Sequence, residues 1–340
     1  MSSQKPLASL SLDADNKWSY LKTHGDPGWE GFPSFLDILV PRVLDFLAQR
    51  KLQITFFVVG QDAALEKNHD ALSAIAAEGH EIGNHSFSHE PWLHLYDREK
   101  IEDEIREAEE HIARVAGQRP VGFRGPGFSF SDATLEVLQK RGYLYDASTF
   151  PTYLGPLSRL YYFLNSHLNA DELERRRSLF GSFRDGFRPL KPYRWGGKGG
   201  LLEIPVTTMP IFRIPIHLSY VLYLSTFSTA LAVGYFRTAL GLCRSTGVSP
   251  SLLLHPLDFL GEDDKVGLDF FPAMKLRADK KLRLVDDVIA AYCEEFQVVS
   301  LREHARHVIE VSHGKALEYG SSDPAPTASV SVNAESELEH

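Results

Sequence analysis

Short apolar segments alternate with amphipathic segments along the first 150 residues, and this alternation constrains the fold more than any other feature. The segments typical of buried strands lie at 7–15, 53–60, 121–130 and 144–150, with 81–89 as a further strand or strand-end loop. The segments with apolar residues at helical spacing lie at 35–51, 70–80, 97–117 and 132–142. Strands that alternate with helices at this pace predict an α/β domain with a parallel sheet.

The remainder of the chain extends this pattern with one interruption and one tail. Strand segments recur at 201–208 and 249–259, and 296–308 reads as a last strand and helix. Residues 151–200 are aromatic and basic with loop punctuation, which predicts an insertion over one end of the sheet. From residue 313 the sequence is small, polar and proline-containing, which predicts a disordered tail over 313–340. We therefore expect one domain over 1–312.

The composition narrows the classes of partner and compartment. The formal net charge is −9, which argues against nucleic acid as a partner. There are two cysteines, Cys243 and Cys293, so no disulfide framework can be inferred and a reducing compartment fits. The N-terminus lacks the apolar core of a secretion signal. We expect a cytoplasmic protein, with a place at the inner membrane face as an alternative.

That alternative comes from an uncharged run of 23 residues between Arg213 and Arg237. Its length is that of a membrane span. However, it contains a proline, a histidine and three tyrosines, and it lies between two predicted core strands. A buried or substrate-groove segment is therefore the preferred interpretation, and contact of residues 214–236 with a membrane surface or a lipid-linked substrate stays open.

Two histidines four residues apart, His85 and His89, follow a Gly-Asn turn. Such a pair is also common as a capped helix start with structural histidines. A catalytic zinc site needs about three protein ligands and an open position. The best third ligand lies in Leu-Asp-Ala-Asp, where Asp13 and Asp15 end the first predicted strand. The period of two puts both carboxylates on one face of that strand, although an Asx turn or helix cap would explain one of them.

Further polar residues end other apolar segments. Arg124 precedes a Gly-Pro-Gly turn, Asp146 ends the strand predicted in Leu-Tyr-Asp-Ala-Ser, and His255 ends the apolar strand of Ser-Leu-Leu-Leu-His. A guanidinium can keep a carboxylate ionised, and a histidine with an acidic partner can act as a general acid. Each of these residues taken alone is more often structural. The carboxyl ends of parallel strands are nevertheless where α/β proteins build their sites.

Taken in chain order, the motifs are Asp-x-Asp, His-x-x-x-His, Arg-x-Pro, Asp and His. This set resembles the polysaccharide deacetylases of the NodB-homology type, also called carbohydrate esterase family four, over about residues 7 to 305. The resemblance implies a distorted (β/α) barrel, with seven strands rather than eight. It also implies metal-dependent N-deacylation of an amino sugar, free in a glycan or carried by a nucleotide or lipid.

The same resemblance implies a role for each motif residue. Asp13 would be the base that takes a proton from metal-activated water, and Arg124 would tether it. Asp15, His85 and His89 would hold the metal, most simply Zn²⁺, with Co²⁺, Ni²⁺ or Mn²⁺ as alternatives. The backbone N–H of Gly127 or Phe128 would contact the oxyanion. Asp146 would orient the acid, and His255 would protonate the leaving amine.

Two departures from the family pattern affect the choice of substrate. The two acids are separated by Ala14 where the usual motif has adjacent acids, a spacing similar to the deformylases of lipid-linked aminoarabinose. Phe128 stands where glycine is usual. Other stretches look like the exopolysaccharide-associated subgroup. The alternatives are a deformylase or cyclic-amide hydrolase on the same scaffold, and a non-catalytic glycan-binding protein.

Overall fold

The computed structural model describes residues 5–155, 183–197, 199–271 and 273–312. Its strands are β1 (Leu7–Asp13), β2 (Thr55–Val58), β3 (Glu81–Asn84), β4 (Gly122–Phe123), β5 (Tyr145–Asp146), β6 (Tyr193–Arg194), β7 (Leu202–Glu203), β8 (Ser251–Leu254) and β9 (Gln297–Val299). They form one nine-stranded sheet in the order β6-β7-β5-β4-β3-β2-β1-β8, with β9 also on β1. The β6–β7 pair is antiparallel, and the other pairs are parallel.

The sheet curls into a distorted barrel, which confirms the expected fold class. Beyond β7, the backbone N–H of Thr207 donates to the carbonyl of Ser251 on β8 at 3.0 Å, so the two sides of the open sheet meet there. The expected count of seven strands is too low. Residues Leu7–Ser9 of β1 pair with β9 and residues Ser11–Asp13 pair with β2, because a seven-residue strand is long enough for two short neighbours.

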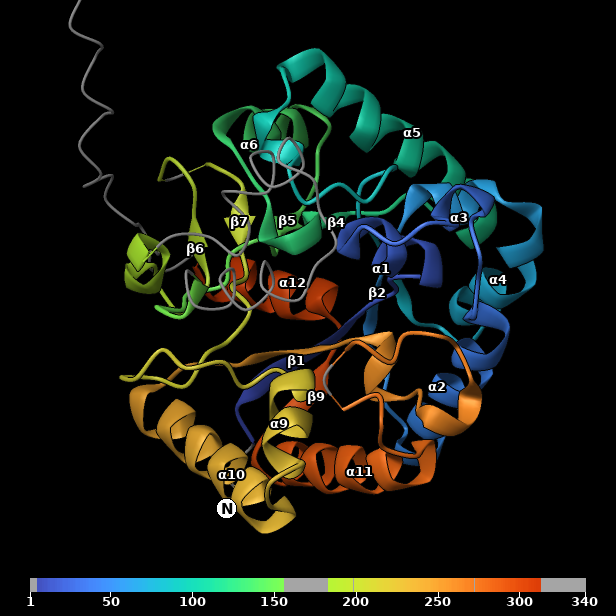
Figure 1. Cartoon of the computed structure of the whole chain (residues 1–340). Helices are drawn as coiled ribbons and strands as arrows, with labels where there is room; N and C mark the ends of the chain where they lie inside the picture. Colours follow the sequence, from blue (N-terminus) through green and yellow to red (C-terminus); the bar gives the residue numbers. More distant parts are fainter. Residues whose placement is uncertain (1–4, 156–182, 198, 272, 313–340) are drawn as a thin grey trace, which may run out of the picture.

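Helices surround this sheet (Figure 1). They are α1 (Lys17–His24), α2 (Leu36–Arg50), α3 (Gly60–Ala64), α4 (His69–Ala77), α5 (Arg98–Ala116), α6 (Asp132–Lys140), α9 (Leu218–Ser225), α10 (Thr229–Thr246), α11 (Ala278–Glu295) and α12 (Leu301–Ser312). In Figure 1, α5 and α6 lie on one side of the strands, and α10 and α11 lie on the opposite side. The alternation of strand and helix predicted from the sequence is confirmed.

Helix α5 shows how the local sequence sets these boundaries. The Asp97 side chain accepts a hydrogen bond from the backbone N–H of Lys100 and caps the first turn. Gly117 ends the helix with a φ of +70°, which costs a residue without a Cβ atom little. Between the caps, one stripe of the helix is buried against the barrel and contains Ile101, Ile105, Ala108 and Ile112.

The uncharged run at 214–236 forms α9 and the first part of α10, separated by a turn in which the Ser228 side chain caps α10. Leu218, Val221 and Leu222 are buried, whereas Phe227 and Leu231 are exposed. None of the described helices combines the length and apolar character that crossing a bilayer requires. The run is thus partly core, and its contact with a membrane stays a prediction.

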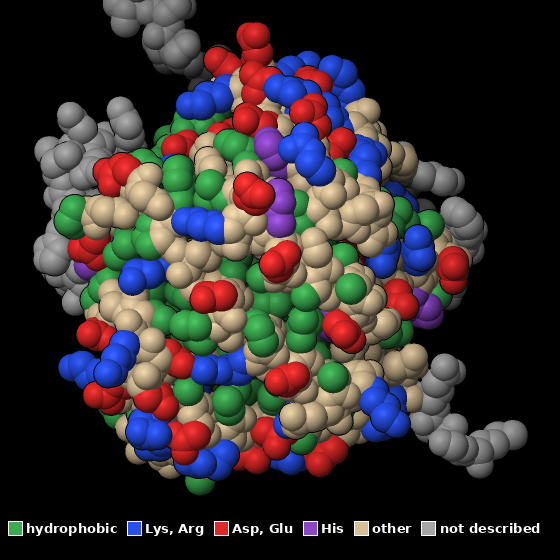
Figure 2. Space-filling model, turned by 90° about the vertical axis from the view of Figure 1, so that its right-hand side faces the viewer, with side chains coloured by type: hydrophobic (Ala, Val, Ile, Leu, Met, Phe, Trp, Pro, Cys, Tyr) green, Lys and Arg blue, Asp and Glu red, His purple; other side chains and the backbone are tan. Residues whose placement is uncertain are grey.

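Two sequence predictions lie wholly or partly outside the described residues. The predicted tail at 313–340 follows α12 and is not described. The predicted insertion at 151–200 is described in part, as a 3₁₀ helix at Phe183–Phe187 and strand β6. On the face that Figure 2 displays, acidic and basic side chains are interspersed around hydrophobic ones. That mixture gives this face no broad positive surface for a nucleic acid.

Candidate metal centre and catalytic site

The predicted site residues follow one another across the carboxyl edge of the sheet. The pairing register places Asp13 beside Phe57 on β2 and Asp146 beside Phe123 on β4. Leu12 pairs with Leu254 on β8, so the next residue of β8, His255, lies level with Asp13. Neighbouring strands are about 4.8 Å apart. Residues far apart in the chain are therefore brought to one edge, as the sequence predicts.

Asp15, His85 and His89 form the candidate metal centre. Their ligand atoms all lie within 4.8 Å of one another, and all three residues are buried. The Asp15 Oδ1 atom is 2.9 Å from the Nε2 atom of His89 and 3.4 Å from that of His85. This carboxylate oxygen makes no hydrogen bond in the structure, although it is buried. Three potential metal-ligand atoms thus converge on one point.

Neighbouring groups fix how each imidazole points. The Nδ1 atom of His85 is 2.6 Å from the backbone carbonyl of Arg124. A carbonyl only accepts, so Nδ1 carries the proton and the Nε2 lone pair of neutral His85 faces Asp15. His89 has a φ of +49°, and its ring packs edge-on against Trp18 with centroids 6.4 Å apart. Both Nε2 atoms are therefore presented as ligands.

The electrostatics of the centre couple the three groups. Burial raises the pKa of Asp15, but His89 and His85 outweigh it and hold that pKa well below its usual range. Burial lowers the pKa of His85, while Asp13 and Asp15 raise it, and the net pKa is above its ordinary value. Two imidazole nitrogens and one carboxylate suit Zn²⁺ and other divalent cations of the first transition row. The residues present fit such an ion.

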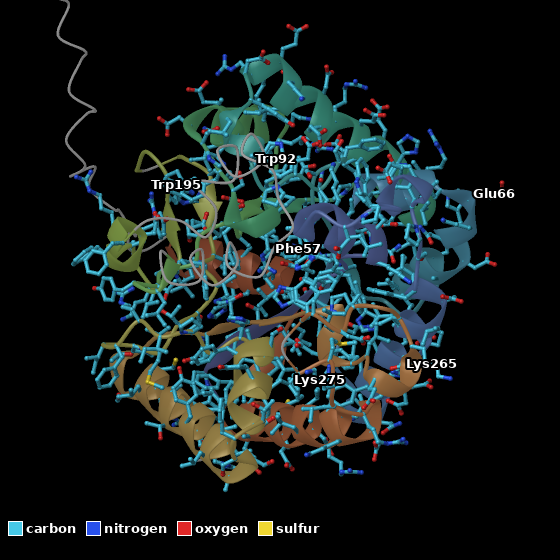
Figure 3. All side chains as sticks on the ribbon, in the orientation of Figure 1. Phe57, Glu66, Trp92, Trp195, Lys265 and Lys275 are labelled. Atoms are coloured by element: carbon cyan, nitrogen blue, oxygen red, sulfur yellow. The ribbon has the colours of Figure 1, made fainter. Side chains whose placement is uncertain are left out.

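Asp13 points to a different partner from Asp15. Its Oδ1 atom accepts a hydrogen bond from the Nη1 atom of Arg124 at 2.5 Å. Arg124 is fully buried and also donates to the Ser11 hydroxyl at 2.9 Å and to the Ala147 carbonyl at 3.0 Å. Its guanidinium lies 4.3 Å from the centre of the Phe57 ring, which Figure 3 labels near the middle of the molecule. Because a buried guanidinium needs such partners, Asp13 and Arg124 form a buried pair joined by a hydrogen bond.

Asp146 has Ser148 and Glu203 as its neighbours in the structure. The Ser148 hydroxyl donates to Asp146 Oδ1 at 2.5 Å, and Glu203 is the residue paired with Asp146 across β5 and β7. Both carboxyl groups are fully buried. Burial raises the pKa of Asp146 to about 6, and burial together with Asp146 raises the pKa of Glu203 well above its usual range. The orienting role expected for Asp146 stays a prediction.

Glu203 was not identified from the sequence. It accepts hydrogen bonds from the backbone N–H and the hydroxyl of Thr149 at 3.0 and 2.6 Å, and from the Trp195 indole at 3.0 Å. The Trp195 label in Figure 3 lies on the β6–β7 side of the molecule. The sequence signal was an acid inside an apolar segment, Leu-Leu-Glu-Ile-Pro-Val. The predicted strand ran over 201–208, so the strand-end rule did not select Glu203, which ends β7 in the structure.

His255 contacts residues that the sequence analysis also missed. Its Nδ1 atom is 3.2 Å from the Ser219 hydroxyl, which donates to Asp258 Oδ1 at 2.6 Å. The His217 ring lies 6.0 Å from the His255 ring, centre to centre. Burial, with a smaller effect of His255, lowers the pKa of His217 to about 3. Helix α9 therefore brings part of the uncharged run into contact with His255.

Gly127 and Phe128 form a tight turn after Arg124. Both have left-handed backbones, with φ of +59° and +62°. The Phe128 N–H donates to the Gly125 carbonyl at 3.0 Å, and the Phe128 ring stacks on Phe150 with centroids 4.8 Å apart. A Cβ atom on Gly125 would lie 1.8 Å from the Ser129 carbonyl oxygen, so this position requires glycine. The turn is held rigidly beside the candidate metal centre.

Comparisons with known proteins agree with this geometry. A sequence profile of the polysaccharide deacetylase family matches residues 28–145. Over these residues the chain is similar to the polysaccharide deacetylase family. Among curated members, a peptidoglycan deacetylase of Helicobacter pylori is 31% identical over 149 residues, which are 42% of this chain and 49% of that protein. A peptidoglycan-N-acetylglucosamine deacetylase of Bacillus cereus is 40% identical over 86 residues, 25% of this chain and 30% of that protein.

The chain thus spans about half or less of the length of these two deacetylases. A solved structure supports the deacetylase fold over nearly the whole chain. A crystal structure titled as a putative polysaccharide deacetylase from Mycobacterium smegmatis matches with a TM-score of 0.58 and 20% identity, over 95% of this chain and 99% of that one. The family resemblance found in the five motifs is confirmed.

Proposed function

We propose that this protein is a metal-dependent hydrolase that removes an N-acyl group, most simply N-acetyl, from an amino sugar. The observation that carries the proposal is the division of labour between two acids two residues apart. Asp15 faces two imidazole nitrogens, while Asp13 is paired with buried Arg124. The deacetylase names of the Helicobacter and Bacillus relatives support the same reaction.

Asp15, His85 and His89 would hold the ion, for which we propose Zn²⁺. A divalent cation supplies Lewis acidity, which makes water a better nucleophile at neutral pH. Asp13 lies two residues before Asp15 in the chain, and Arg124 holds its carboxylate in place. It is therefore suited to accept the proton that water loses when it attacks the amide carbonyl.

The other two steps fall to residues on neighbouring strand ends. His255 is level with Asp13 across β1 and β8 and would donate a proton to the departing nitrogen. The backbone N–H of Phe128 is engaged by the Gly125 carbonyl, so Gly127 is the better oxyanion donor of the two. The products are an amine and a small carboxylate. We place the substrate among glycans and nucleotide-linked or lipid-linked saccharides met in the cytoplasm.

The test is acyl release by purified protein that has been stripped with a chelator and reloaded with Zn²⁺. The substrates are N-acetyl and N-formyl amino sugars, free, nucleotide-linked and lipid-linked, with acetate and formate quantified. We expect release that requires metal and disappears in Asp13→Asn, which keeps the size of the side chain. Formate release alone would move the assignment to a deformylase. One bound metal per chain without any acyl release would contradict the hydrolase.

A further inference from the structure

We infer that Asp258, acting through Ser219, is the positioning group for His255, and that Asp146 does not have this role. The inference rests on the proposed function, because it assigns the orientation of the proposed general acid. It adds two residues that lie outside the five motifs. It also assigns a task to the first turn of α9, which belongs to the uncharged run that the sequence left open.

The contacts form a continuous chain from a buried carboxylate to the imidazole. Asp258 is 1% exposed and follows His255 by three residues in a 3₁₀ turn. Its Oδ2 atom accepts the backbone N–H of His255 at 2.7 Å, and its Oδ1 atom accepts the Ser219 hydroxyl at 2.6 Å. The Ser219 oxygen then lies 3.2 Å from His255 Nδ1. One carboxylate thus holds both the backbone and the ring of His255.

This chain of contacts determines which nitrogen of His255 carries its proton. A serine hydroxyl has a single hydrogen, and here that hydrogen is directed to Asp258. The Ser219 oxygen can then only accept from His255, so Nδ1 is the protonated nitrogen. The second nitrogen, Nε2, is left free to hold or release the catalytic proton. The logic is that of a carboxylate that orients a catalytic imidazole, with a hydroxyl interposed.

Donors and positive charges around Asp258 favour its acceptor form against the effect of burial. The Lys281 ammonium is 1% exposed and donates to the carbonyls of Leu257 and Leu260, on either side of Asp258. The charges of His255 and Lys281 act against the burial that raises the pKa of Asp258. The other titratable groups nearby are His217, whose pKa is lowered to about 3, and Tyr20, whose pKa Asp258 helps to raise. His217 is therefore neutral at pH 7, and a tyrosine carries no positive charge, so neither competes with His255 for Asp258.

Asp146 is engaged elsewhere. Its carboxyl is paired across strands with Glu203 and bound by the Ser148 hydroxyl; burial raises the pKa of Asp146, and burial together with Asp146 raises the pKa of Glu203. A carboxyl that shares its site with another acid is a poor partner for an imidazolium ion. Asp146→Asn and Asp258→Asn therefore form a matched pair of substitutions in two buried acids.

The decisive measurement is the tautomer of His255, read by two-dimensional ¹H–¹⁵N NMR of the imidazole in the full chain and assigned with His255→Gln. The Nδ1–H form is expected in the unsubstituted protein and in Asp146→Asn. In Asp258→Asn the amide can still accept the His255 backbone N–H while donating to Ser219. Ser219 then donates to Nδ1, so the Nε2–H form is expected. Ser219→Thr should keep the Nδ1–H tautomer of His255. Ser219→Ala should leave His255 without a preferred tautomer.

The kinetic readout separates positioning from folding. Asp258→Asn should lower kcat by about 10- to 100-fold with KM nearly unchanged. The alkaline limb of its kcat profile should move to lower pH, because an imidazolium ion without its anionic partner loses its proton more readily. An Nδ1–H tautomer that persists in Asp258→Asn, or one that is reversed in Asp146→Asn, would overturn the inference. The tautomer is readable without turnover, so absence of acyl release would count against the proposed function alone.

Discussion

The two ends of the barrel both bury titratable side chains, but they satisfy them to different extents. At the amino end, Glu81 is 2% exposed and its carboxylate accepts three hydrogen bonds. Thr55 donates its hydroxyl at 2.6 Å, Tyr145 its hydroxyl at 3.0 Å, and Arg302 its backbone N–H at 2.8 Å. The Thr55 hydroxyl oxygen in turn accepts the Leu301 N–H at 2.8 Å. This network joins α12 to the sheet, and both the Glu81 carboxylate and the Thr55 hydroxyl have hydrogen-bond partners in it.

The carboxyl end contains most of the buried polar atoms that lack a hydrogen-bond partner. They include atoms of Asp15, Tyr20, Asp62, His89, Arg124, Asp146 and His217. Buried polar groups are normally paired because an unpaired one costs stability. Their concentration at the end where the motifs meet indicates that these groups serve a ligand, whereas the amino-end network serves the fold. We therefore expect substitutions at the carboxyl end to reduce activity and substitutions at the amino end to reduce stability.

The largest effect should come from Asp15→Asn. It replaces the ligand on which both imidazoles converge, so the proposed metal affinity and acyl release should both fall, the latter by about 10³-fold or more. The free energy of unfolding of the metal-free protein should fall by only about 1–2 kcal/mol, through the loss of the Asp15 contacts with the two imidazoles. Metal content by mass spectrometry and denaturant titration measure the two quantities.

Asp37→Asn on the exposed face of α2 is the matched control, with both quantities unchanged. A fall in stability of several kcal/mol in Asp15→Asn, with metal content preserved, would assign Asp15 to the fold and contradict the comparison.

Glu81→Ala should show the opposite pattern. The substitution removes the acceptor of Thr55, Tyr145 and the Arg302 N–H, and an unsatisfied buried donor costs about 1 kcal/mol or more. We expect a loss of about 3 kcal/mol in the free energy of unfolding. The acyl-release rate per folded molecule should be unchanged. Denaturant midpoints measure the first quantity, and Glu78→Ala, at an exposed position nearby, is the control. A selective loss of kcat would show that the two ends are coupled.

The comparison also explains how much could be predicted from sequence. Asp13, Asp15, His85, His89 and Arg124 each follow an apolar segment, so strand periodicity was sufficient to bring them to one edge. Ser219, Asp258 and Glu203 were missed for different reasons. Ser219 belongs to an uncharged run without a motif, and its contact with His255 spans 36 residues of sequence. Asp258 reads as a helix cap. The expected strand number came from the family resemblance, and short strands such as the two-residue β6 exceed that number.

The smallest expected effect is a pH dependence that originates at the amino end. Burial lowers the pKa of His304 from 6.5 to about 4, with a smaller contribution from His307, and burial lowers the pKa of His80 to about 4. Each folded-state pKa is below the unfolded value, so the unfolded chain binds more protons between pH 6.5 and 4. The stabilisation is fully present above pH 6.5 and is lost as the pH falls toward 4.

The structure gives the physical cause. His80 Nδ1 accepts the Ile54 backbone N–H at 3.2 Å, and a proton on that nitrogen would remove the acceptor. His304 packs against β1, with its Nδ1 atom 2.9 Å from the Ser9 hydroxyl. Thermal unfolding between pH 7 and 4 should therefore show a smaller decline in His304→Gln than in the unsubstituted protein. His307→Gln, at an exposed position of the same helix, should nearly keep the original slope. Equal slopes in all three proteins would mean that the carboxyl-end groups dominate acid unfolding, and the division between a structural and a functional end would fail.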